Sequence, residues 1–91
     1  MITLAASDLF VLADRKAVMI RLPAFEWDFT LGLAIRLRAG AHSLRGRQVG
    51  TGNHEGKATV MLVPDDWASA ETELQAMAGH QGDILLEKAE P

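Results

Sequence analysis

The sequence predicts an α+β fold: a small two-layer α/β sandwich, with two helices packed on one face of a three- to five-stranded sheet. Three observations support this fold class. The 91 residues are enough for one globular domain, spanning residues 1–91, and 48% of them are hydrophobic, as in ordinary globular chains. Short apolar runs typical of strands alternate with two segments of helical composition. Helices separated by strands in so short a chain favour two layers.

Two apolar runs near the N-terminus predict a β-hairpin. Residues 9–13 and 17–20 flank a three-residue polar turn, a pattern typical of paired strands. The rival interpretation is a single amphipathic helix that Ser7 would cap. We favour the hairpin because both runs contain β-branched residues and Pro23 follows the second run.

Residues 25–39 give two conflicting signals. Apolar and polar residues alternate strictly, which is the pattern of a half-buried strand. From Leu31 onward, however, Leu, Ala and Arg dominate, and this composition favours a helix. Asp28 is suited to the helix N-cap and Gly46 to the position after the last turn. We therefore expect a helix over residues 28–45, with a mostly β fold containing one helix as the alternative.

A second hairpin is predicted in the middle of the chain. Residues 59–63 are the clearest strand in the sequence, and residues 47–49 can pair with them across a turn at 53–56. Half of the eight glycines lie between positions 46 and 56, so we expect this segment to be rich in loops.

The C-terminal part predicts a helix, a last strand and a tail. Asp65 or Asp66 is a suitable N-cap, and apolar residues then recur at spacings of three and four until Gly79. Residues 84–86 form a short strand, connected by a right-handed crossover if it runs parallel to the strand at 59–63. Residues 87–91 are expected to be a frayed acidic tail.

Charge is sorted along the chain. Residues 1–63 contain eight basic and five acidic groups, whereas residues 64–91 contain one basic and seven acidic groups. We expect a basic face and an acidic face, which favour an anionic partner or head-to-tail self-association. A domain of this size buries only about 60% of its unfolded surface, so a homo-oligomer would gain stability.

Several classes of function lack support in the sequence. The chain has no cysteine, which excludes disulfides and thiol chemistry. No apolar run approaches the ~18 residues of a membrane span, and the first residues do not resemble a secretory signal. We expect a cytoplasmic protein that does not insert in a membrane.

No motif indicates an enzyme, a metal site or a cofactor. The glycine-rich segment 46–57 fails as a Walker phosphate loop, because its spacing is one residue short and Ala58 replaces the hydroxyl residue. The histidines at 42, 54 and 80 lack the spacing of metal ligands. No serine lies in a nucleophile elbow. We therefore predict no catalytic, cofactor-binding or metal-binding residues and recognise no family signature.

A cluster of basic residues is the best candidate for a binding site. We expect a regulatory, protein-binding module that contacts an anionic macromolecular surface, which we take to be an acidic protein. Nucleic acid is the alternative partner, and a small-ligand or phosphate-binding enzyme is the third hypothesis. A solvated surface whose arginines pair with nearby acids is the non-functional interpretation. The predicted contacts are Arg36, Arg38, Arg45, Arg47 and Lys57, with Trp27 as an apolar anchor.

Overall fold

The computed structural model describes residues 1–24 and 26–90. Two positions named in the sequence predictions lie outside the described residues: Phe25, which opens the alternating segment, and Pro91, which ends the expected tail. The described strands are β1 (Ile2–Leu4), β2 (Leu9–Leu12), β3 (Ala17–Arg21), β4 (Ala34–Ala39), β5 (His42–His54), β6 (Lys57–Pro64) and β7 (Ile84–Lys88). The helical elements are α1 (Trp67–Ala78) and two short 3-10 helices, η1 (Ala6–Asp8) and η2 (Ala13–Arg15).

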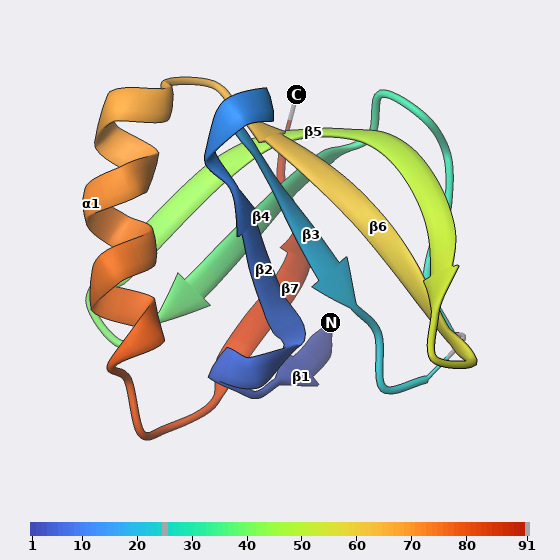
Figure 1. The fold of residues 1–91 in the computed structure, drawn as a ribbon, viewed down its shortest axis with the longest axis horizontal. Coiled ribbons are helices and arrows are strands. Elements are labelled where there is room, and N and C mark those ends of the chain that lie inside the picture. The colour runs from blue at the N-terminus through green and yellow to red at the C-terminus, as the bar shows by residue number, and fades with distance from the viewer. Residues whose placement is uncertain (25, 91) are drawn as a thin grey trace.

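All seven strands belong to one antiparallel sheet. Their order is β1-β7-β4-β5-β6-β3-β2, and the sheet curls into a half-barrel (Figure 1). The α-helix α1 stands along one side of this curve and contacts β5, β6 and η1. With only 12 residues, α1 is shorter than a bilayer-spanning helix, and no helix of the described chain is long and apolar enough to cross a membrane.

The predicted fold class is wrong. The structure is mostly sheet, with one α-helix among the described residues and seven strands, instead of two helices on a three- to five-stranded sheet. The predicted crossover is also wrong, because β4 and β5 lie between β6 and β7, and β7 pairs antiparallel with β4 and β1. The short strand β1 was not predicted.

The expected helix over residues 28–45 is replaced by the β4–β5 hairpin. Ala39 pairs with His42 across a two-residue turn, and Gly40 has a φ of +61° in that turn. A glycine at positive φ allows the chain to reverse, and an α-helix cannot continue through it. The strict alternation was the correct signal, because Ile35 and Leu37 are buried while the arginines between and after them are not.

Most of the other predicted elements are confirmed, but the glycine segment expected to be rich in loops is strand, because β5 continues through the glycines at 46, 50 and 52 to His54. The β2–β3 and β5–β6 hairpins form as expected, with Arg47 opposite Val63. The predicted second helix is α1, preceded by Asp66 at the N-cap, where its carboxylate accepts a hydrogen bond from the Ser69 hydroxyl at 2.7 Å. The last strand extends two residues into the expected tail, because Glu87 and Lys88 belong to β7.

The core lies on the inner face of the half-barrel. Leu37, Leu62 and Leu86 come from three different strands and are fully buried. Leu74 and Met77 of α1 pack into the same cluster. Burying each such side chain contributes about 1.5–3 kcal/mol before conformational entropy is counted. Because one face of each strand is fixed in this core, alternate residues must lie on the opposite, outer face.

Candidate functional site on the outer face of the sheet

Four of the predicted contact residues lie together on the outer face. Arg36 is directly opposite Arg45 in the β4–β5 pair, while Arg38 and Arg47 are two residues away from them along their strands. The side chains of Arg36, Arg38 and Arg45 are 42%, 48% and 43% exposed. The prediction placed Arg36, Arg38 and Arg45 on a helix and Arg47 on the following strand. The structure brings all four together because alternate residues of neighbouring strands share a face.

Acidic residues from the C-terminal part of the chain lie next to these arginines. Glu87 is opposite Arg36, and its Oε1 atom lies 3.4 Å from Nε of Arg36 and 3.1 Å from Nε of Arg38. Asp65 Oδ2 lies 3.3 Å from Nε of Arg45. The charge separation along the sequence is therefore not a separation in space here. Four arginines face two carboxylates, so this surface keeps an excess of positive charge.

The internal contacts leave part of each guanidinium available. Arg36 and Arg38 meet Glu87 through Nε, and no contact of their terminal Nη groups is found among the described residues. Arg45 donates from Nη2 to the carbonyl of Glu90. Arg47 donates from Nη1 to the carbonyl of Gly32 at 3.3 Å and has no carboxylate partner among the described residues. These donors can form additional bonds with carboxylates, whose geometry suits the planar guanidinium.

Trp27, the predicted apolar anchor, is half-buried in the structure. It packs against the core, and its indole Nε1 donates a 2.7 Å hydrogen bond to Oε1 of Gln48. Gln48 is fully buried, and its Nε2 donates to the carbonyls of Asp28 and Thr30, both at 2.9 Å. The Trp27 side chain thus fixes the loop before β4. Sequence reasoning missed Gln48, although a polar residue at an inward position of a strand would have marked it.

The same loop carries the one strongly perturbed acid among the described residues. The Thr30 hydroxyl and backbone N–H both donate to Oδ1 of Asp28, and Nζ of Lys88 lies 3.1 Å from Oδ2. These interactions stabilise the carboxylate and lower the pKa of Asp28 from 3.8 to about 2. The loop that borders Arg47 is therefore held by ionic and hydrogen-bonding contacts at neutral pH.

Lys57 does not join the arginines. It lies opposite His54 next to the β5–β6 turn, whereas Arg47 lies opposite Val63. Six residues of strand separate positions 57 and 63 of β6, which corresponds to about 20 Å. The expectation that Lys57 acts together with the arginines gains no support from this placement.

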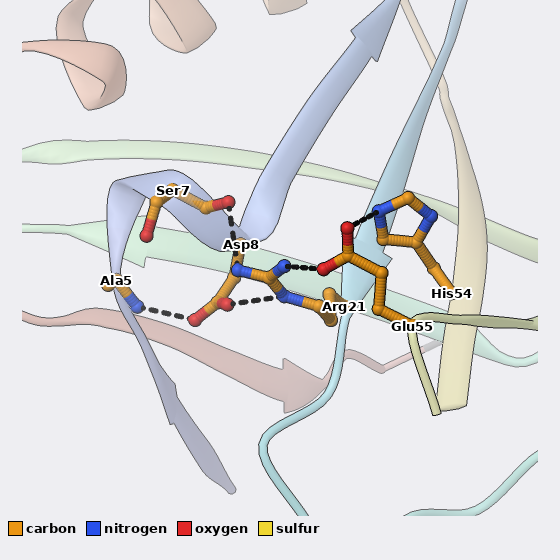
Figure 2. Close-up of polar contacts among 6 residues, drawn as sticks. All are labelled: Ala5, Ser7, Asp8, Arg21, His54 and Glu55. Atoms are coloured by element: carbon orange, nitrogen blue, oxygen red, sulfur yellow. Dashed lines mark hydrogen bonds and ion pairs between the residues drawn. The ribbon is translucent and has the colours of Figure 1, made fainter. Parts of the chain in front are cut away.

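A second polar cluster occupies the end of the sheet near Lys57. Figure 2 shows Arg21 between Asp8 and Glu55, with Nε 3.1 Å from Asp8 Oδ1 and Nη1 3.7 Å from Glu55 Oε2. His54 Nε2 lies 3.8 Å from Glu55 Oε1, which is beyond hydrogen-bond distance. The His54 ring also meets Phe10 edge to face, at a centroid distance of 5.3 Å.

This cluster joins the β5–β6 turn to η1 and β3, segments far apart in the sequence. Glu55 has a φ of +52°, a conformation that Asn or Gly adopts more readily in such turns. Two carboxylates face the Arg21 guanidinium, and Lys57 lies opposite His54 at the same end, so the acidic and basic side chains there balance. No group of three metal-ligating side chains is found among the described residues.

A shallow groove of about 230 Å³ lies between the arginines and this cluster. It is formed on β3, β5 and β6, and its lining includes Met19, Met61 and Thr59 together with the glycines at 50 and 52. The sequence indicated only a glycine-rich loop here. The groove depends on the pairing of Met19 with Met61, which no local pattern reveals.

Comparison with known proteins does not assign a role to these surfaces. No protein-family model matches the chain, and no curated protein or solved structure is similar to it. The arginine surface, the groove and the polar cluster are therefore interpreted from their chemistry.

Proposed function

We propose that this chain is a non-enzymatic binding module that recognises an acidic protein surface through the outer face of β4 and β5. The observation that carries the proposal is the placement of Arg36, Arg38, Arg45 and Arg47 on one face of two neighbouring strands. Arginine clusters suit carboxylate recognition because each planar guanidinium offers several donors in a fixed geometry.

The surroundings of Arg47 favour a protein over a nucleic acid. Leu31, Val49 and Val63 are 67%, 46% and 36% exposed. Val63 lies opposite Arg47, and Arg47 contacts the carbonyl of Gly32, which follows Leu31. Arginine beside exposed aliphatic side chains is typical of protein interfaces. Glu87, Asp65 and the net charge of −3 oppose every anionic partner alike, so the exposed aliphatic side chains, and not the charge, favour a protein.

Binding of simple anionic probes tests this proposal. A fluorescein-labelled peptide of alternating Glu and Ser and a labelled DNA duplex of equal length are titrated with the protein, and fluorescence anisotropy is followed. We expect the peptide to bind at low ionic strength and to weaken as salt rises, because exposed charges are screened beyond about 10 Å at 0.1 M. A duplex that binds more tightly, with a steep logarithmic dependence on salt, would favour the nucleic-acid alternative.

Three variants locate the binding surface. The double substitution Arg45→Glu and Arg47→Glu is expected to abolish peptide binding. As a matched control, the single variants Arg47→Glu and Lys57→Glu are compared. Each replaces one exposed cation, and Lys57 lies about 20 Å away along β6. Arg47→Glu should weaken binding and Lys57→Glu should not. Equal effects of the two substitutions would show that only net charge matters and would overturn the proposal.

The setting and oligomeric state expected from the sequence remain predictions. We propose that the module acts in the cytoplasm, which cell fractionation checks. We also propose that it forms a homodimer at micromolar concentration, because a chain of 9.9 kDa has a small core. Sedimentation that gives only the monomer mass over the whole micromolar range would exclude this dimer.

A further inference from the structure

We propose that the groove formed by β3, β5 and β6 receives one bulky apolar side chain of the same acidic partner. This inference rests on the proposed function and specifies the chemistry of the partner. The recognised segment is then extended, with two acidic residues opposite the arginines and an apolar residue over the groove.

The size and lining of the groove suit a single side chain. Its volume of about 230 Å³ is below the roughly 300–1,000 Å³ of pockets that hold drug-sized ligands. The half-buried thioether side chains of Met19 and Met61 contribute to its lining. Methionine is flexible and polarisable, so it adapts to apolar groups of different shape and recurs on protein-binding surfaces. An apolar anchor that fills a pocket is the usual source of affinity at such surfaces.

Gly50 follows the register shift of β5, but neither its φ nor close packing requires a glycine there. Its φ is not positive, and a Cβ atom added there would lie 4.0 Å from Cβ of Met61, which is ordinary contact. Glycine inside a strand destabilises it by about 0.5–1 kcal/mol relative to alanine. Such a glycine often marks a site where another molecule approaches the backbone. The open space above Gly50 is the feature that this residue provides.

The groove and the arginine surface are continuous. Val63 lies opposite Arg47, and Met61 is two residues further along the same face of β6. Two residues of strand span about 7 Å, which is also the repeat between side chains on one face of an extended peptide. A partner segment with acids at positions i and i+2 and an apolar residue at i+4 therefore matches Arg45, Arg47 and the groove in turn.

Charge at the far end of the groove fixes the order of these residues. Arg21 lies opposite Thr59, just beyond Met61, and is already in contact with Asp8 and Glu55. Arg21 and Lys57 balance Asp8 and Glu55, so this end offers no excess of positive charge to a carboxylate. The acidic residues of the partner are therefore expected on the side of Arg45 and Arg47, with the apolar residue at the end without excess charge.

Short peptides test the inference. The labelled peptide Glu-Ser-Glu-Ser-Phe and its counterpart ending in Gly are prepared in both chain directions and titrated with the protein at low ionic strength. We expect the Phe peptide to bind about tenfold more tightly than the Gly peptide in one direction, as expected for an apolar anchor. Gly50→Val should lower the affinity for the Phe peptide to that for the Gly peptide. It should leave the affinity for the Gly peptide unchanged. Thr3→Val, at an exposed position of β1, is the control and should change the affinity for neither peptide.

An arginine-independent measurement separates this inference from the proposed function. N-acetyl-phenylalaninamide at millimolar concentration should shift the backbone amide signals of Gly50, Gly52 and Met61 in NMR spectra of the wild-type protein, and not of Gly50→Val. Equal affinities of the Phe and Gly peptides, together with unshifted signals, would overturn the proposed role of the groove and leave the proposed role of the arginine surface intact. Shifted signals without binding of either peptide would support the groove as an apolar site and overturn its link to an acidic partner.

Discussion

The two halves of β5 use glycine for opposite reasons. In the first half, His42–Gln48, the strand pairs with β4, and from Gly46 it also pairs with β6. A Cβ atom on Gly46 would come within 2.1 Å of the Val63 carbonyl oxygen. In the second half, the strand pairs only with β6 among the described elements, and a Cβ atom on Gly50 would have ordinary space. The register shift between Gln48 and Gly50 separates the halves. Close packing determines the first glycine, whereas the second leaves surface free for binding.

Gly46→Ala should produce the largest loss of stability. The added methyl group meets backbone atoms of Val63 and Pro64, which cannot rotate away as a side chain can. Forcing such a contact in a packed interior destabilises proteins by about 1–3 kcal/mol and in some cases more, and we expect about 3 kcal/mol here. Urea denaturation gives the free energy of unfolding. A loss below about 1 kcal/mol would show that β5 and β6 can separate at this point, and the proposed difference between the two halves would be wrong.

Gln48→Ala should be the next most damaging change. It removes the acceptor of the Trp27 indole and the donor to two loop carbonyls, and it leaves a cavity at a fully buried position. We expect a cost of about 2–3 kcal/mol. Trp27→Phe is the comparison variant, because it keeps an aromatic ring while it loses the 2.7 Å hydrogen bond to Gln48 and part of the indole volume. A greater loss in Trp27→Phe than in Gln48→Ala would mean that the ring, and not the glutamine, fixes the loop.

Acid should release the loop next to the first half of β5. The pKa of Asp28 is lowered from 3.8 to about 2, so the charged carboxylate favours the folded state. Its contribution is complete above the unfolded pKa of about 3.9 and is lost as pH falls through about 2. The chemical shift of the Thr30 amide proton should titrate with a midpoint near 2 and stop responding in Asp28→Asn. A midpoint at or above 3.8 would contradict the contacts with Thr30 and Lys88.

The difference between the two halves of β5 also explains which parts of the fold the sequence could predict. The β5–β6 hairpin has a local signal, since the turn at 53–56 contains Asn53 and Gly56 between residues able to pair. The β4–β5 hairpin has helical composition, and its strand identity depends on pairing with β7, where Arg36 meets Glu87 some fifty residues later. Local propensity is easily overridden by such non-local pairing. The strict alternation and Gly40 were the local warnings against a helix.

The candidate site was predicted as a set of residues and not as a surface. The arginines at 36 and 38 and those at 45 and 47 stand at alternate positions, and the register set by the two-residue turn places both pairs on one face. Their partners Glu87 and Asp65 come from the acidic part of the chain, and only the folded topology brings the two together. The groove needs Met19 from another hairpin, which explains why the glycine segment alone indicated only a loop.

Gly50→Ala should have the smallest effect on stability, and in the opposite direction from Gly46→Ala. The backbone at Gly50 is not at positive φ, and the new methyl group would lie 4.0 Å from Met61. Replacing glycine at a compatible position stabilises a protein by about 0.4–1 kcal/mol, chiefly because the unfolded chain loses conformational freedom. The two alanine variants carry the same chemical change four residues apart on one strand. The difference between their free energies of unfolding therefore measures how differently the two halves of β5 tolerate a side chain. If Gly50→Ala were instead destabilising by more than about 1 kcal/mol, Gly50 would be required by the fold, and its open space would no longer support a binding groove.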